Sequence, residues 1–268
     1  MEFARPQNLD DALDARAASP TADLLAGGTD LMVEVNLAYH RPDGVVSLRD
    51  VDQLKEWEGG RIGAGVTWQR LESAPHRALA QLSRTIGSPQ IRNSGTIGGN
   101  IGTASPAGDG LPWLAVLEAG IEVASRDRGT RVVPWDEFFV GVKKTSLAPD
   151  EIVTAAVLPA EMPRRQEFAK IGVRAAMVIS TVAAVVARFD DGRVRVGLGS
   201  VAPTPIRAYH AEEMISAEKK PSDGALAEFA RLVAEEVRPI TDHRSTEQYR
   251  RHASGVLARR LLERCLAA

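Results

Sequence analysis

Two glycine-containing stretches are the most informative part of this chain of 268 residues: Ala26-Gly27-Gly28-Thr29-Asp30-Leu31 and Thr96-Ile97-Gly98-Gly99-Asn100. Each stretch joins an apolar segment to a polar turn through a glycine pair. Because glycine has no side chain, backbone N–H groups in such a stretch can approach the oxygens of a phosphate closely. A single glycine pair usually serves only a tight turn. Two of them in one domain predict a dinucleotide whose pyrophosphate lies between two loops.

The segment after the second glycine pair supports this prediction. Residues 101–112 are mostly small or hydroxylated, with Thr103, Ser105 and Asp109 among them. Such residues have too little bulk to fill a hydrophobic core, yet they offer several hydrogen-bonding groups. The composition is typical of a segment that wraps a ligand.

Two other glycine-containing segments do not fit the common nucleotide motifs. Residues 60–65 are followed by Val66, whereas a Walker A loop continues with lysine and serine or threonine. Residues 197–202 have the spacing of a Rossmann fingerprint, but Pro203 and Pro205 prevent a helix from beginning where the pyrophosphate would lie. We interpret residues 197–202 as the end of a strand.

Both glycine stretches, together with residues 101–109, closely resemble the FAD-binding subunit of the molybdenum hydroxylases, the family of xanthine dehydrogenase and carbon monoxide dehydrogenase. The segment Thr103-Ala104-Ser105-Pro106 is more similar to the xanthine dehydrogenases than to the carbon monoxide dehydrogenases. The resemblance covers nearly the whole chain. It continues in five further places: Arg92, Phe138-Phe139-Val140-Gly141, residues 145–152, Lys170-Ile171-Gly172-Val173-Arg174 with Ile179, and Asp242-His243-Arg244-Ser245 with Tyr249-Arg250.

The resemblance implies an α+β fold. It consists of the two-part FAD-binding domain of the vanillyl-alcohol oxidase (PCMH) type and a smaller C-terminal α+β domain. We expect the FAD-binding domain at residues 1–170, with subdomains at about 1–53 and 54–170. The C-terminal domain, residues 171–268, should contain short antiparallel strands and helices.

The resemblance also implies that FAD lies extended between the two subdomains. Because no histidine near the glycine stretches could attach it, we expect FAD to be bound non-covalently. N–H groups of residues 26–31 and 96–100 would hold the pyrophosphate. Asp109 would bond the ribose or adenine end, Ile86 would cover adenine, and Ile179 would lie near the reactive side of the flavin ring. The implied cofactor-binding residues are Leu25, Ala26, Gly27, Gly28, Thr29, Asp30, Leu31, Ile86, Thr96, Gly98, Gly99, Asn100, Thr103, Ala104, Ser105, Asp109, Val153, Lys170 and Ile179.

Several of these residues also have a purely structural interpretation. Asp109 could cap a helix that begins near Pro112. Val153 and Ile179 could belong to the core, and Lys170 could be a solvated surface lysine. The residues by themselves leave these alternatives open.

Composition excludes other classes of function. The net charge is −2, with Lys and Arg scattered, so nothing points to nucleic acid or a membrane surface. No apolar segment is long enough to span a bilayer, and no signal-peptide pattern is present. One cysteine, Cys265, excludes an internal disulfide and a Cys-ligated cluster. The five histidines lack metal-ligand spacing. We therefore expect no metal site, no catalytic residue and a cytoplasmic protein.

The function implied by the resemblance is electron transfer. Electrons from 2Fe–2S clusters on one partner chain, fed by a large molybdopterin subunit, would reach FAD on this chain and pass to NAD or another acceptor. The complex would be a dimer of heterotrimers. Two alternatives stay open at this point: a stand-alone FAD-dependent oxidase or dehydrogenase, and a scaffold that has lost its redox role.

Hydrophobic patterning predicts the principal elements. Ser222 should cap a helix with Leu226, Phe229 and Val233 on one stripe, and Ser245 with Gln248 should form the capping box of the last helix. We expect further helices near residues 9–13, at 78–86 and after Pro112. Strands are expected at residues 24–26, 45–48, 121–125, 131–134, 152–158, 182–189 and 194–198, with a hairpin turn at 190–192.

Overall fold

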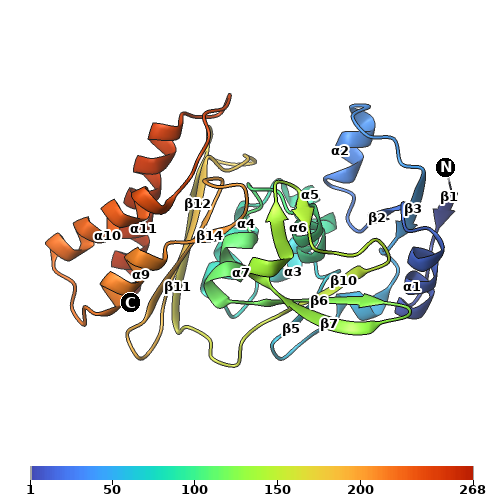
Figure 1. Ribbon diagram of the computed structural model, residues 1–268, viewed down its shortest axis with the longest axis horizontal. Coiled ribbons are helices and arrows are strands. Elements are labelled where there is room, and N and C mark those ends of the chain that lie inside the picture. Colours follow the sequence, from blue (N-terminus) through green and yellow to red (C-terminus); the bar gives the residue numbers. More distant parts are fainter. Residues whose placement is uncertain (1, 268) are drawn as a thin grey trace.

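Three of the four sheets follow one another along the long axis of the molecule in the computed structural model, which describes residues 2–267, and the fourth is a two-stranded hairpin (Figure 1). The N-terminal sheet lies at one end, a five-stranded sheet lies in the middle, and the C-terminal sheet with its helices lies at the other end (Figure 1). Helices and strands both contribute to each part. The α+β fold expected from the sequence is therefore present.

The N-terminal sheet is parallel, with the strand order β1-β3-β2. Helix α1 packs on it through Ala12 and Leu13, which share a core with Val46 and Leu48. The helix begins where it does because the Asn8 side chain accepts a hydrogen bond from the Asp11 amide at 2.9 Å. The elements of this part are β1 (Glu2–Ala4), α1 (Leu9–Ala18), β2 (Asp23–Leu25), α2 (Leu31–Asn36), β3 (Gly44–Ser47) and the 3₁₀ turn η1 (Asp52–Lys55).

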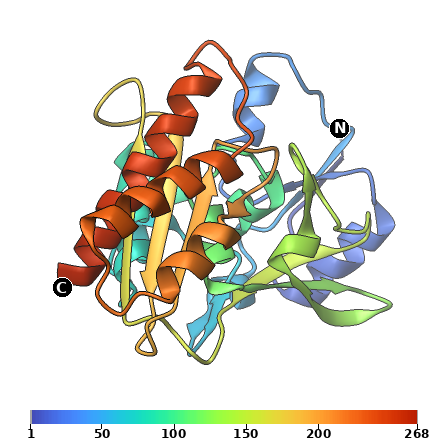
Figure 2. The ribbon, with the colours of Figure 1, turned by 60° about the vertical axis from the view of Figure 1, so that its left-hand side comes forward.

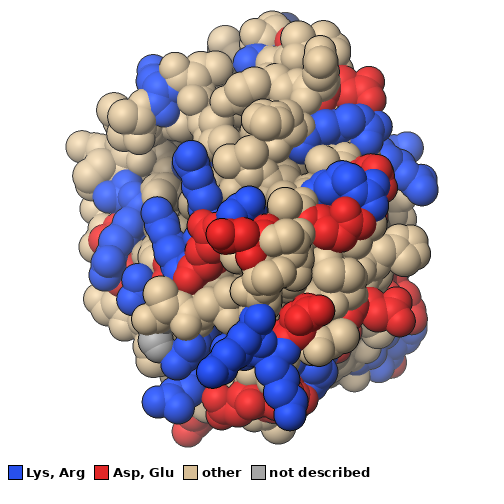
Figure 3. Space-filling model, turned by 90° about the vertical axis from the view of Figure 1, so that its left-hand side faces the viewer, with Lys and Arg blue, Asp and Glu red and all other residues tan. Residues whose placement is uncertain are grey.

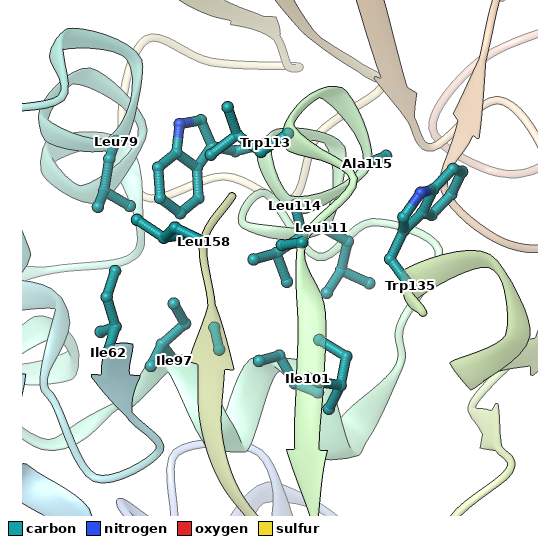
Figure 4. Packing of buried hydrophobic residues seen from close by; sticks show 14 of the residues in the cluster. Ile62, Leu79, Ile97, Ile101, Leu111, Trp113, Leu114, Ala115, Trp135 and Leu158 are labelled. Carbon is teal, nitrogen blue, oxygen red and sulfur yellow. The ribbon is translucent and has the colours of Figure 1, made fainter. Parts of the chain in front are cut away.

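The middle sheet is antiparallel, with the strand order β4-β5-β10-β6-β7. Its core lies between the sheet and the helices, where Leu79 and Leu158 lie next to the fully buried Trp113 and Ile62 and Ile97 lie closer to the strands (Figure 4). The elements are β4 (Trp57–Glu58), β5 (Arg61–Gly63), α3 (Trp68–Leu71), α4 (Arg77–Thr85), α5 (Pro89–Ser94), α6 (Ile97–Thr103), α7 (Leu111–Leu117), β6 (Gly120–Ser125), β7 (Gly129–Pro134), α8 (Trp135–Phe138), the hairpin β8 (Phe139–Gly141) and β9 (Lys144–Thr145), and β10 (Ile152–Val157).

The C-terminal sheet is covered on both faces. Helices α9 to α11 lie on one face (Figure 2), and α4 and α7 contact the other. Alternate residues of β12 accordingly belong to different cores. Val182, Ala184 and Val186 belong to the core of the C-terminal part, whereas Ala183 and Val185 belong to the core of the middle part. This two-sided burial explains why β12 reads as one continuous apolar run. The elements are β11 (Arg165–Ile171), β12 (Val182–Arg188), β13 (Val194–Gly199), β14 (Ile206–Arg207), α9 (Tyr209–Ser216), α10 (Asp223–Glu236) and α11 (Glu247–Ala267).

Two sequence expectations are wrong in detail. The boundary placed after Lys170 falls inside β11, which pairs along its whole length with β12 and so belongs to the C-terminal sheet. The capping box at Ser245 does not form. The Ser245 amide donates instead to Asp242, and Thr246 Oγ1 accepts the Tyr249 amide at 3.2 Å as α11 begins.

The expectations for the Ser222 cap and for the hairpin turn at residues 190–192 are confirmed. Ser222 caps α10, with its hydroxyl accepting the Ala225 amide at 3.2 Å. Gly192 turns the β12–β13 hairpin with φ +95°. Cys265 is completely buried on α11, and burial raises the pKa of its thiol to about 12.

The outer face of the C-terminal domain carries mixed charge. Basic and acidic side chains alternate over it without forming one large field of a single sign (Figure 3). Arg231 on α10 pairs with Glu228 at 2.6 Å, and Arg259 on α11 pairs with Glu263 at 2.8 Å. Among residues 2–267, no helix combines the length and the apolar character needed to cross a membrane.

Candidate functional site

A cleft of about 740 Å³ lies where the three parts of the chain meet. One end is lined by Arg16, Leu48 and Leu54, next to α1 and β3, and the other end by Ile86 and Lys170, next to α4 and β11. Helix α1 lies near the N-terminal end of the molecule, whereas α4 lies near its middle (Figure 1). The cleft is therefore elongated across both parts of the N-terminal domain, as an extended dinucleotide would require.

The first glycine stretch lines this cleft between β2 and α2. The backbone amides of residues 27–31 donate to no protein acceptor within the part of the chain that the structure describes. Gly28 adopts φ +70°, a left-handed conformation that glycine accepts without strain. Five consecutive amides are thus left for a ligand, and the last of them belongs to Leu31, the first residue of α2.

The first glycine stretch contacts the residues on both sides of the second. A Cβ on Gly27 would lie 1.9 Å from the Ser94 carbonyl oxygen, so Gly27 is required for this close approach. At the far end of the stretch, Thr103 Oγ1 donates to Asp30 at 3.2 Å. Arg92 anchors the neighbouring helix α5 by an ion pair with Glu72 and a hydrogen bond to the Gly87 carbonyl at 3.1 Å.

The second glycine stretch is the first turn of helix α6, a form that the sequence reading missed. Thr96 Oγ1 accepts the Gly99 amide at 3.0 Å, and the Gly98 amide donates to the Ala64 carbonyl at 2.8 Å. These amides already have protein partners, so the expectation that they hold a pyrophosphate does not fit the geometry. A Cβ at Gly102 would meet nothing within 4 Å, and one at Gly99 only Thr96 Oγ1. Gly99 and Gly102 therefore keep this wall of the cleft open.

A buried ion pair lies at the β11 end of the cleft. Lys170 Nζ is 2.6 Å from Asp109 Oδ2 and also donates to the carbonyls of Thr85 at 3.0 Å and Val178 at 3.1 Å. The Ser180 hydroxyl donates to the other carboxylate oxygen. Burial raises the pKa of Asp109, although Lys170 and Ser180 act in the opposite direction. Gly110, and not Asp109, occupies the N-cap position of α7.

These contacts also bring Ile86 and Ile179 together. Ile86 follows Thr85, and Ile179 follows Val178, and both preceding carbonyls accept from the same Lys170 ammonium. Adenine at Ile86 and flavin at Ile179 would then have to occupy the same end of the cleft, although they are opposite ends of an extended FAD. The expected role of Ile86 at adenine, and that of Asp109 at the ribose or adenine, therefore conflict with a flavin at Ile179.

All the cofactor-binding residues implied by the sequence line the cleft except Ala104. Ala104 ends α6 in a left-handed conformation and is buried against the protein, with its carbonyl accepting the Lys143 amide at 3.1 Å. Sequence reasoning missed Arg16, Leu48, Leu54 and Trp68 on the cleft walls. Arg16 had one available signal, since it follows the buried Ala12 by four residues on the same face of α1.

Residues 1–161 match the family described as the FAD binding domain in molybdopterin dehydrogenase, and residues 167–265 match the CO dehydrogenase flavoprotein C-terminal domain. A xanthine dehydrogenase FAD-binding subunit of Escherichia coli O157:H7 is 32% identical over 286 residues, with 99% of this chain and 96% of the relative covered. The chain belongs to the FAD-binding subunits of the molybdenum hydroxylases.

Other members of this family are also similar. A nicotinate dehydrogenase FAD-subunit of Eubacterium barkeri is 35% identical over 238 residues, which cover 80% of this chain and 79% of the relative. A chain in the structure of carbon monoxide dehydrogenase from Hydrogenophaga pseudoflava matches with a TM-score of 0.90 at 28% identity, covering 100% of this chain and 97% of that one. The fold of this FAD-binding subunit is thus that of the CO dehydrogenase medium chain.

The cleft of this FAD-binding subunit has the donors that FAD requires. Free amides at residues 27–31 suit an anionic pyrophosphate, and the open wall at Gly99 leaves room beside them. Aliphatic side chains line the two ends, including Leu48 and Leu54 at one and Ile86 and Ile179 at the other. Among the described residues, no three His, Cys, Asp or Glu side chains are grouped to hold a metal ion.

Proposed function

We propose that this chain holds FAD non-covalently and serves as the electron-transfer subunit of a molybdenum hydroxylase complex. It takes electrons from 2Fe–2S clusters of one partner chain, which a large molybdopterin subunit reduces, and passes them to NAD or another acceptor. The observation that carries the proposal is the run of five free amides at residues 27–31 on the wall of an elongated cleft. Family membership supplies the class of complex.

The residues of this chain position the cofactor, while FAD, when bound, supplies the redox chemistry. The amides of residues 27–31 hold the pyrophosphate. Lys170, fixed by Asp109, presents a buried ammonium group to the flavin end of the cleft. Ile179 is 53% exposed there, so it borders the path by which an acceptor reaches the flavin.

The partners follow from the relatives. The matched proteins are named as subunits or medium chains of dehydrogenases, which supports a complex with further subunits. We propose that this complex is a heterotrimer that pairs into a dimer. The residues 103–106 favour an enzyme of the xanthine dehydrogenase type over one of the carbon monoxide type. We further propose a cytoplasmic location, in keeping with a single cysteine that is buried and unpaired.

Purification of the chain alone and together with its partners tests the proposal. The isolated chain is expected to bind one FAD and to contain no stoichiometric iron or molybdenum. The co-purified complex is expected to contain all three. A chain that binds no FAD, or that carries iron or molybdenum by itself, would overturn the subunit assignment.

A further inference from the structure

Arg16 is a buried cation without a counter-ion. It is only 9% exposed, and no carboxylate lies within ion-pair distance of it among residues 2–267. Its Nη1 donates to the Ala22 carbonyl, while Nε is buried without any acceptor and Nη2 has no acceptor in the described part of the chain. The guanidinium group thus keeps unused donors, and the residue lines the cleft.

A buried guanidinium group with unused donors is energetically unfavourable unless a ligand supplies the missing acceptors. Transfer of a charged group out of water is unfavourable, and buried donors normally find acceptors. Burial lowers the pKa of Arg16, and the more distant Asp23 and Asp150 raise it only in part. A ligand that places an acceptor in this end of the cleft would satisfy the guanidinium group.

The position of Arg16 indicates which part of a dinucleotide would do so. Arg16 is bound to Ala22, directly before β2, whereas the free amides begin after β2 ends. Three strand residues separate these points by roughly 10 Å. Arg16 therefore lies about one strand length from the pyrophosphate amides. Lys170 lies at the opposite end of the cleft, beside α4.

The surroundings of Arg16 are partly apolar and suit the face of a flat ring, although Asp23, Arg49 and Lys55 also line the cleft. Leu48 and Leu54 line this end and pack in the same core as α1, and Val153 follows Ile152 of that core. Adenine has two apolar faces and ring nitrogens that accept hydrogen bonds. A guanidinium group offers donors in a fixed planar arrangement to such an edge.

Building on the proposed function, we infer that Arg16 recognises the adenine base of FAD, with its guanidinium group donating to a ring nitrogen. This assignment sets the direction of the cofactor. Adenine lies between α1 and β3, and the flavin lies at Lys170, Ile86 and Ile179.

Binding of FAD, ADP and FMN to the cofactor-free chain, measured by calorimetry, tests the inference. Arg16→Met removes the donors at similar volume, and its FAD and ADP affinities are expected to fall about tenfold or more. The affinity for FMN, which lacks adenine, is expected to stay within about twofold of the unsubstituted chain, because the donors lost do not reach FMN. Arg16→Lys, which keeps the charge but loses the planar fork, should show the same selective loss and replaces Arg16→Met if that variant does not fold.

Arg126→Met is the matched control, because Arg126 pairs with Asp10 and Asp14 on α1 outside the cleft. It should leave the affinities for all three ligands unchanged. Equal losses of FAD and FMN affinity in the Arg16 variants would show a purely structural role, and no loss of either would remove Arg16 from the site. Failure of the unsubstituted chain to bind FAD would instead contradict the proposed function itself.

Discussion

At the scale of single residues, the glycines of the cleft serve two different purposes. Gly27 and Gly98 are required by packing, because a Cβ would lie 1.9 Å from the Ser94 oxygen and 2.4 Å from the Ala64 Cβ, respectively. Gly99 and Gly102 are not crowded in this way and instead keep the cleft open. A substitution at Gly99 therefore changes the space for the ligand more than the packing of the protein.

Gly99→Asp is expected to abolish tight FAD binding. The carboxylate would lie on the open wall of the cleft and repel the pyrophosphate from the amides of residues 27–31. The loss of two of these charge-assisted hydrogen bonds costs on the order of 3–6 kcal/mol. Gly224→Asp is the control, since Gly224 also lies in the first turn of a hydroxyl-capped helix but faces no ligand. Equilibrium dialysis with FAD is the measurement. A folded Gly99→Asp protein with unchanged FAD affinity would remove this wall from the site.

Lys170→Met is expected to destabilise the protein by about 3–5 kcal/mol, because Asp109 would remain buried with no counter-charge. Adding Asp109→Asn should recover part of this loss, since the unpaired carboxylate is then gone. Urea unfolding of both variants measures the free energies. Additive losses in the double variant would show that the two side chains do not act as a pair.

At the scale of elements, the C-terminal helix α11 is tied to the sheet by one arginine. Arg250 donates to the carbonyls of Thr181 at 2.8 Å and Ser200 at 2.7 Å, and it pairs with Asp242 at 2.7 Å. Burial raises the pKa of Asp242. The amides of Arg244 and Ser245 together with Arg250 outweigh this and lower it to about 2.

This ion pair predicts a loss of stability in acid. Because the pKa of Asp242 is lower in the folded than in the unfolded chain, its contribution is complete above about pH 4 and is lost as the pH falls toward 2. We expect about 1–2 kcal/mol, allowing for solvent screening of a carboxylate near the surface. Asp242→Asn should remove this part of the pH dependence of urea unfolding. An unchanged acid profile in that variant would contradict the assignment.

Sequence patterns predicted the elements that depend on local signals. Ser222 predicted the start of α10, and the apolar run at residues 182–189 predicted the strand that is β12. Helix α6 was missed because its glycines have low helix propensity, and the fold compensates with the Thr96 cap and packing against Ala64. The predicted capping box at Ser245 does not form because the Ser245 amide donates to the side chain of Asp242, three residues earlier.

The sequence predicted many of the residues that line the cleft, but not which of them lie at the same end of it. Nearly all the residues that the motif resemblance implied do line the cleft. The resemblance could not show that Ile86 and Ile179 share one end, because Lys170 joins them through carbonyls distant in sequence. Arg16 carries no motif at all. Its significance arises only from burial without a partner, which is a property of the folded chain.

At the scale of the whole molecule, the cleft lies where all three parts of the chain meet. Residues from the N-terminal sheet, the helices of the middle part and strand β11 all contribute to its walls. A ligand bound there contacts every part and stabilises their arrangement by mass action. The proposed function requires no substrate-activating base on this chain, because its task is to position the flavin between an electron donor and an acceptor.

Anaerobic stopped-flow reduction of the flavin tests this central claim most directly. The FAD-loaded chain is mixed alone with a purine or an aldehyde, and separately with NADH, and the complete complex is mixed with the same organic substrates. We predict that a substrate of the enzyme bleaches the flavin only in the complex, while NADH reduces the flavin of the isolated chain. Direct bleaching of the isolated chain by an organic substrate would contradict the electron-transfer role and would indicate a stand-alone dehydrogenase.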